Sequence, residues 1–97
     1  KAIEIAKQKN ISLKAGNVFT SDDFYDDDFE TYKKWSKFGV LCVEMETAGL
    51  YTVAAKHNVH ALTILTISDS LVTKESTTSK ERETTFKEMI EIALELA

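Results

Sequence analysis

The chain has 97 residues, of which 43% are hydrophobic and 29% charged, and its net charge of −4 comes from 16 acidic against 12 basic residues. Such values are typical of one soluble globular domain and argue against a nucleic-acid surface, which would carry a basic patch. No apolar run approaches the ~20 residues that span a membrane, so we expect no membrane partner. The single cysteine, Cys42, excludes an internal disulfide and fits a reducing, cytoplasmic compartment, where it would be an inert buried thiol.

The N-terminal region carries an amphipathic helical pattern over residues 1–9, with Asn10 as its stop signal. This pattern opens without a Ser, Thr, Asp or Asn that would cap a helix. We therefore expect these residues to be the last turns of a helix, and the chain to be the C-terminal part of something longer. Alternating apolar side chains then predict a strand over residues 11–19.

The central region begins with an acidic loop over residues 21–28. This loop lacks the Gly and the terminal Glu of a calcium-binding loop, so we predict no metal site there. Asp27 and Glu30 have the spacing of a capping box, which predicts a helix that ends at Gly39. A short second strand is expected over residues 40–45.

In the C-terminal half, the residue pattern predicts a helix, a buried strand and a second helix. Small residues across 46–58 suit a helix that packs closely on a sheet. The apolar, β-branched run over 59–67 is typical of a strand buried on both faces. After a polar loop, apolar residues recur with the 3.6-residue period up to the end of the chain, and Thr78 and Glu81 form the capping box of this last helix.

The order of these elements, α-β-α-β-α-β-α, predicts the fold class. It is typical of a layered α/β/α fold with a mostly parallel, mixed sheet. No linker or repeat divides the chain, so we treat residues 1–97 as a single domain segment. In open α/β sheets ligands bind at the carboxyl ends of the strands, and polar residues stand at two such ends, 43–46 and 68–69.

The third predicted strand ends on Ser68 and Asp69. A solvated loop could hold the same two residues. Arg82, however, is a cation in the first turn of the last helix, where the helix dipole disfavours positive charge. We therefore expect a negative partner near it. Asp69 is the natural candidate, and Glu81 or Glu83 in open water is the alternative.

The second predicted strand ends on Glu44 and Glu46, two residues apart, so that extended backbone would send both side chains to one face. Carboxylates only accept hydrogen bonds, and either could clamp a cis-diol such as a ribose. Alternatively, one of them caps the following helix, because its N-terminus favours negative charge. Met45 would face the other way. No Ser-His-Asp arrangement, Cys-x-x-Cys pair or phosphate-cradling glycine loop is present.

Four short motifs fall at characteristic separations between about Lys14 and Leu96. They are Gly16-Asn17-Val18-Phe19 with Phe24-Tyr25, Val43-Glu44-Met45-Glu46-Thr47-Ala48-Gly49, Thr66-Ile67-Ser68-Asp69, and Glu81-Arg82-Glu83-Thr84-Thr85-Phe86. In this combination the sequence resembles the C-terminal part of a bacterial, hexameric-type purine nucleoside phosphorylase. The Val-Glu-Met-Glu piece alone is shared with related nucleosidases, whereas the arginine motif favours the phosphorylase.

The resemblance implies a nucleoside pocket. Glu46 would hold the ribose 2′- and 3′-hydroxyls, with Met45 packed on the sugar and Glu44 close by. Phe24 would lie against the base or sugar, and Val43 would line the base pocket.

The resemblance also implies an acid. Asp69 would protonate purine N7, Ser68 would stand beside the base, and Arg82 would assist Asp69. An ordinary aspartate is ionised at neutral pH, so this role requires a site that favours the protonated form. The next residue, Ser70, stands where close relatives often carry His, which could shift the base preference.

The expected activity is phosphorolysis of purine ribo- or deoxyribonucleosides to free base and (deoxy)ribose 1-phosphate. Inorganic phosphate would be the co-substrate, no cofactor would be needed, and the enzyme would be a homohexamer, a trimer of dimers. The phosphate-binding loop and arginines of this family lie in its N-terminal part, so we expect this chain alone to be inactive. The alternatives are a nucleosidase that hydrolyses 5′-methylthioadenosine or S-adenosylhomocysteine, and a non-catalytic nucleoside-binding fragment.

Overall fold

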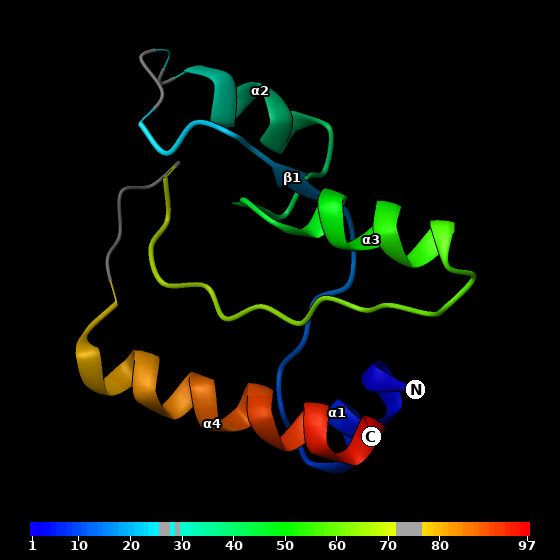
Figure 1. Ribbon diagram of the computed structural model, residues 1–97. Coiled ribbons are helices and arrows are strands. Elements are labelled where there is room, and N and C mark those ends of the chain that lie inside the picture. The colour runs from blue at the N-terminus through cyan, green and yellow to red at the C-terminus, as the bar shows by residue number, and fades with distance from the viewer. Residues whose placement is uncertain (26–27, 29, 72–76) are drawn as a thin grey trace. The chain divides into compact units, whose positions relative to one another are not determined.

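The structure is a computed structural model that describes residues 1–25, 28, 30–71 and 77–97. Its elements are α1 (Ala2–Gln8), β1 (Val18–Thr20), α2 (Glu30–Lys37), β2 (Cys42–Glu44), α3 (Thr47–Lys56) and α4 (Ser79–Leu96) (Figure 1). They belong to two compact units, one of Lys1–Ala15 with Ile64–Ala97 and one of Gly16–Thr63. None of the described helices is both long and apolar enough to cross a membrane.

The first unit is built on the contact between α1 and α4, and Figure 1 shows α1 beside the C-terminal end of α4. Ala6 on α1 and Ile92 on α4 are both only 2% exposed and form the core of this unit. Asn10 ends α1 with a left-handed φ of 56°, as predicted, and the next amide, of Ile11, donates to the Ala6 carbonyl at 2.8 Å.

The predicted start of α4 is confirmed. Thr78 is its N-cap, and the Thr78 hydroxyl oxygen accepts a hydrogen bond from the Glu81 amide at 3.1 Å. Much of the apolar stripe predicted for this helix is exposed, because Phe86 is 47% exposed and Leu94 is 70% exposed, and the buried residue, Ile92, lies outside the predicted stripe. The pattern therefore identified the helix correctly but not how much of its apolar face is covered.

The second unit contains a β1-α2-β2 crossover in which β1 and β2 pair in parallel, as predicted. Stacked rings of Phe19 on β1 and Trp35 on α2, with centroids 5.2 Å apart, pack the helix on the strands. Asp28 accepts a hydrogen bond from the Glu30 amide at the start of α2, and Gly39, with φ of 77°, follows its end. The capping role predicted for Asp27 falls outside the described residues.

The first predicted strand is shorter than expected, since β1 begins only at Val18, near the end of the range 11–19, and ends at Thr20. The second is likewise reduced from 40–45 to Cys42–Glu44. A strand exists only where a partner takes its backbone hydrogen bonds, and alternation of side chains does not reveal how far that pairing extends.

The prediction of a third strand over 59–67 is wrong. None of these residues belongs to a strand, and Leu62 and Ile67 are 57% and 53% exposed rather than buried. The Thr63 amide donates to the Tyr51 hydroxyl on α3 at 3.0 Å instead of to a neighbouring strand. The described chain is therefore an α/β structure with a small parallel sheet and four helices.

Candidate functional site

Glu44 is bound on both carboxylate oxygens at the point where β2 leads into α3. One oxygen, Oε1, accepts a hydrogen bond from the Thr20 hydroxyl at the end of β1. The other, Oε2, accepts from the backbone amides of Glu46 at 2.6 Å and Thr47 at 2.7 Å. Glu44 thus supplies acceptors for the first amides of α3, which have no partner within the helix. This settles which carboxylate serves as the helix cap.

These hydrogen bonds favour the ionised form of Glu44. Burial alone would raise the pKa of its carboxyl, but the hydrogen bonds from the Thr20 hydroxyl and from the backbone of the following turn outweigh burial and lower the pKa from its ordinary 4.5 to about 2. The carboxyl is therefore ionised in the folded state throughout the neutral and weakly acidic range, and its charge stabilises the start of α3.

We expect the stabilising effect of Glu44 to depend on pH. The pKa is lower in the folded state than in the unfolded state, so the contribution to stability is complete above pH 4.5 and is lost as the pH falls towards 2. Unfolding by urea would be compared for the wild type and Glu44→Gln, in the longest natural chain that contains this sequence, hereafter the full-length protein. The difference in unfolding free energy should shrink between about pH 7 and about pH 3. An equal difference at both pH values would contradict the role of the charge.

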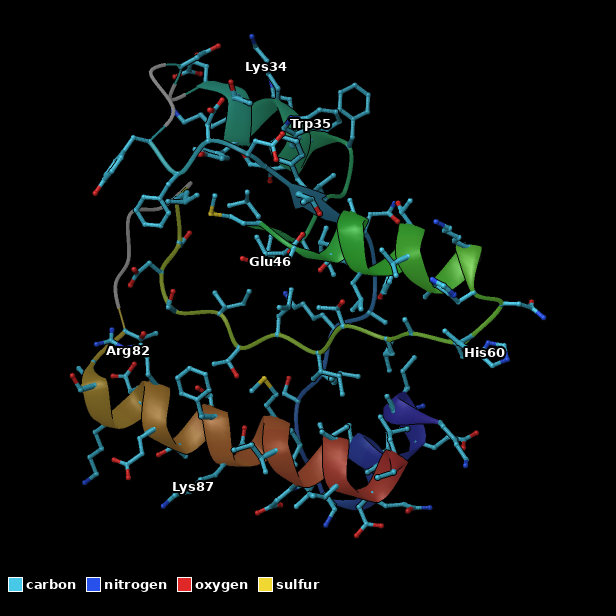
Figure 2. All side chains as sticks on the ribbon, viewed as in Figure 1. Lys34, Trp35, Glu46, His60, Arg82 and Lys87 are labelled. Atoms are coloured by element: carbon cyan, nitrogen blue, oxygen red, sulfur yellow. The ribbon has the colours of Figure 1, made fainter. Side chains whose placement is uncertain are left out.

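Glu46 differs from Glu44 in that its side chain is exposed, at the start of α3 (Figure 2). Among the described residues, its Oε2 accepts one hydrogen bond, from the neighbouring Met45 amide at 3.3 Å. Because β2 ends at Glu44 and residues 45–46 form a bend, the two carboxylates do not leave one face of an extended strand. Met45 is 39% exposed rather than buried in the core. The turn therefore presents one carboxylate to solvent, where a ligand can reach it.

The other predicted pocket residues of this unit are Val43 and Phe24. Val43 is half-buried on β2, where it pairs with Phe19 of β1. Phe24 is 72% exposed and packs edge-to-face on Tyr25, with ring centroids 4.9 Å apart. The Phe24 ring is therefore accessible to solvent rather than packed in the core.

In the other unit, Ser68 is held at the entrance to α4 by a residue that sequence reasoning did not single out. Thr77 donates hydrogen bonds to the Ser68 carbonyl from its amide, at 3.2 Å, and from its hydroxyl. The side chain of Asp69 is exposed. A threonine just before an N-cap carries no distinctive pattern, because its partner lies nine positions upstream.

Arg82 does not pair with Asp69 in this structure. Its Nη1 donates to the Thr77 carbonyl at 2.6 Å and its Nη2 to the Ser79 hydroxyl at 3.3 Å, at the N-terminal end of α4 (Figure 2). The ion pairs among the described residues involve neither Arg82 nor Asp69. A carbonyl and a hydroxyl, rather than the expected carboxylate, thus stabilise the cation in the first turn. Thr77 links Arg82 to Ser68.

The remaining candidate chemistry is limited. Burial raises the pKa of the Cys42 thiol, and the negative charge of Glu44 raises it further, so the thiol is protonated at neutral pH. Within the described residues, no three His, Cys, Asp or Glu side chains lie close enough together to hold a metal ion.

Comparison with known proteins assigns the chain to a family. The family model described as the phosphorylase superfamily matches residues 1–97. The chain therefore belongs to the phosphorylase superfamily.

Three relatives specify the resemblance further. The chain is 62% identical to a protein of Thermoanaerobacter sp. (strain X514), 60% identical to one of Exiguobacterium sibiricum and 60% identical to one of Clostridium novyi, in each case over its whole length. Each relative is named as a DeoD-type purine nucleoside phosphorylase, which confirms the predicted resemblance. The chain spans only 41–42% of the length of these relatives.

Proposed function

We propose that the full-length protein is a purine nucleoside phosphorylase. The observation that carries this proposal is the difference between the two carboxylates at the end of β2: Glu44 is bound to the protein on both oxygens, and Glu46 is exposed. An exposed carboxylate at the carboxyl end of a parallel strand suits a ligand with paired hydroxyls. Relatives that bear this enzyme's name at 60–62% identity indicate that the ligand is a nucleoside.

In the proposed reaction a phosphate oxygen attacks C1′ of the sugar, and the bond from C1′ to the purine nitrogen breaks. The base leaves with the bonding electron pair, and Asp69 donates a proton to purine N7 to neutralise it. Arg82 would approach the resulting carboxylate and stabilise its charge late in the reaction, where stabilisation accelerates the chemical step. At present Arg82 is held by Thr77 and Ser79, so this approach requires its guanidinium to move.

Residues around the nucleoside would have the roles that the resemblance implies. Glu46 holds the ribose hydroxyls, Met45 packs on the sugar, and Phe24, Val43 and Ser68 contact the base or sugar. The resemblance implies that Glu44 lies close to the nucleoside. In this proposal Glu44 acts indirectly instead, because it holds the start of α3, from which Glu46 extends.

The whole enzyme would use inorganic phosphate as co-substrate, without a cofactor. It would act in purine salvage in the cytoplasm, as a homohexamer. The residues that hold phosphate would lie outside this chain, and the complete protein would have the layered α/β/α fold with a larger mixed sheet. The support for this proposal is the family and the length of the relatives, of which the chain spans about two-fifths.

The test is release of base from inosine by the full-length protein, with and without phosphate. We expect release that requires phosphate and yields ribose 1-phosphate. Release from 5′-methylthioadenosine without phosphate would overturn the proposal in favour of a nucleosidase. No release under either condition would leave a nucleoside-binding protein without this chemistry.

A further inference from the structure

We propose that Thr20 is a positioning residue that orients the Glu46 carboxylate for the substrate's ribose, acting through Glu44 and the first turn of α3. The proposal rests on the proposed function, since it assumes that Glu46 binds the sugar. Thr20 does not belong to the motifs that carry the family resemblance, and it lies at the end of β1 rather than in the turn that presents Glu46.

The geometry places Thr20 between two groups that a hydroxyl can satisfy together. In the sheet register Thr20 pairs with Glu44, so the last residues of the two strands are neighbours. The Thr20 hydroxyl donates to Glu44 Oε1 and accepts a hydrogen bond from the Ala48 amide at 3.0 Å. A carboxylate can only accept and an amide can only donate, so the group between them must do both.

This hydroxyl completes a chain of hydrogen bonds from β1 to the backbone of Glu46. Glu44 is held on Oε1 by Thr20, and its Oε2 binds the Glu46 amide at 2.6 Å. The backbone from which the Glu46 side chain extends is therefore held by the Glu44 carboxylate, whose own orientation depends on Thr20. The Ala48 amide is among the first amides of α3 and has no partner within the helix, so the hydroxyl also holds the helix itself.

Loss of the hydroxyl would loosen this arrangement without removing any group that touches substrate. Valine has the shape of threonine but neither donates nor accepts hydrogen bonds, so Glu44 and the Ala48 amide would both lose a partner. Displacement of a binding group by ~1 Å can cost up to about 10²-fold in activity. Because Glu46 would hold the ribose, we expect the effect on the KM for the nucleoside, whereas loss of folded protein would lower kcat alone.

The experiment compares Thr20→Val, Thr20→Ser and Thr52→Val in the full-length protein. Thr52 is a matched control because it is a threonine on α3, the helix that Thr20 holds. Its hydroxyl donates to the Ala48 carbonyl at 2.7 Å and not to the turn that presents Glu46. We expect Thr20→Val to raise the KM for inosine about tenfold, which corresponds to roughly one hydrogen bond between Glu46 and the ribose. Thr20→Ser should restore the wild-type KM, and Thr52→Val should leave it unchanged. If Thr20→Val does not fold, Thr20→Ala removes the same hydroxyl with less bulk.

A substrate that lacks the diol tests the route through Glu46. The KM for 2′,3′-dideoxyinosine should be the same in the wild type and in Thr20→Val, because Glu46 has no hydroxyls to hold there. An unchanged KM for inosine in an active, folded Thr20→Val protein would overturn the proposal, and so would an equal rise for both substrates. A wild type that releases no base with phosphate would overturn the proposed function itself, and this proposal with it.

Discussion

Replacement of Asp69 by asparagine is expected to slow phosphorolysis of inosine in the full-length protein by about 10²–10⁴-fold, the usual effect of a well-placed general acid. Asparagine has nearly the same shape but cannot give up a proton to purine N7. The Asp69 side chain is exposed and is not part of the buried core, so the variant should fold normally. The KM for inosine should change little, since the proton is transferred only as the bond to the base breaks.

The control for this prediction is a nucleoside already alkylated at N7, such as 7-methylinosine. Its base carries the positive charge that protonation would otherwise supply, so it leaves without an acid. Asp69→Asn should cleave it at close to the wild-type rate. An equal loss for inosine and 7-methylinosine would show that Asp69 supports binding or folding rather than proton transfer.

Glu46→Gln should lower kcat/KM for inosine by about 10- to 10²-fold, because hydrogen bonds to a charged acceptor are stronger than those to a neutral amide. The side chain is exposed and accepts one long hydrogen bond from a neighbouring amide, so the substitution should disturb the fold little. Steady-state kinetics with inosine would measure the loss. Glu91→Gln, at an exposed carboxylate on α4, is the matched control and should leave the kinetics unchanged.

The same variant also distinguishes ribose binding from other roles. With 2′,3′-dideoxyinosine the wild type and Glu46→Gln should have similar values of kcat/KM, because the hydroxyls that Glu46 holds are missing. The effects of altering the enzyme and of altering the substrate would then not add, which is the signature of two groups that are coupled, either by direct contact or through one hydrogen-bond network. Additive effects would instead place Glu46 away from the sugar.

Several features of the chain could be predicted because their causes lie within a few residues. The cap at Thr78 depends on an amide three positions away, and the stop at Asn10 depends on a left-handed φ that asparagine tolerates. The parallel pairing of β1 and β2 follows from the strand-helix-strand order. The family resemblance likewise rests on short motifs at fixed separations, which are local patterns, and comparison with known proteins confirmed it.

The sequence by itself thus determined the helices, the parallel crossover and the family, and it proposed the residues that would carry chemistry. Only the tertiary structure decided that 59–67 forms no strand here, that Glu44 rather than Glu46 caps α3, and that Arg82 binds a carbonyl and a hydroxyl. In each case the deciding partner is distant in the sequence or is chosen by the fold. A hydrophobic run is extended and buried only when other strands take its hydrogen bonds, and a charged side chain binds whichever partner the fold brings within reach. Thr20 shows this most clearly, because its partner Glu44 lies 24 positions away in the sequence and beside it in the sheet.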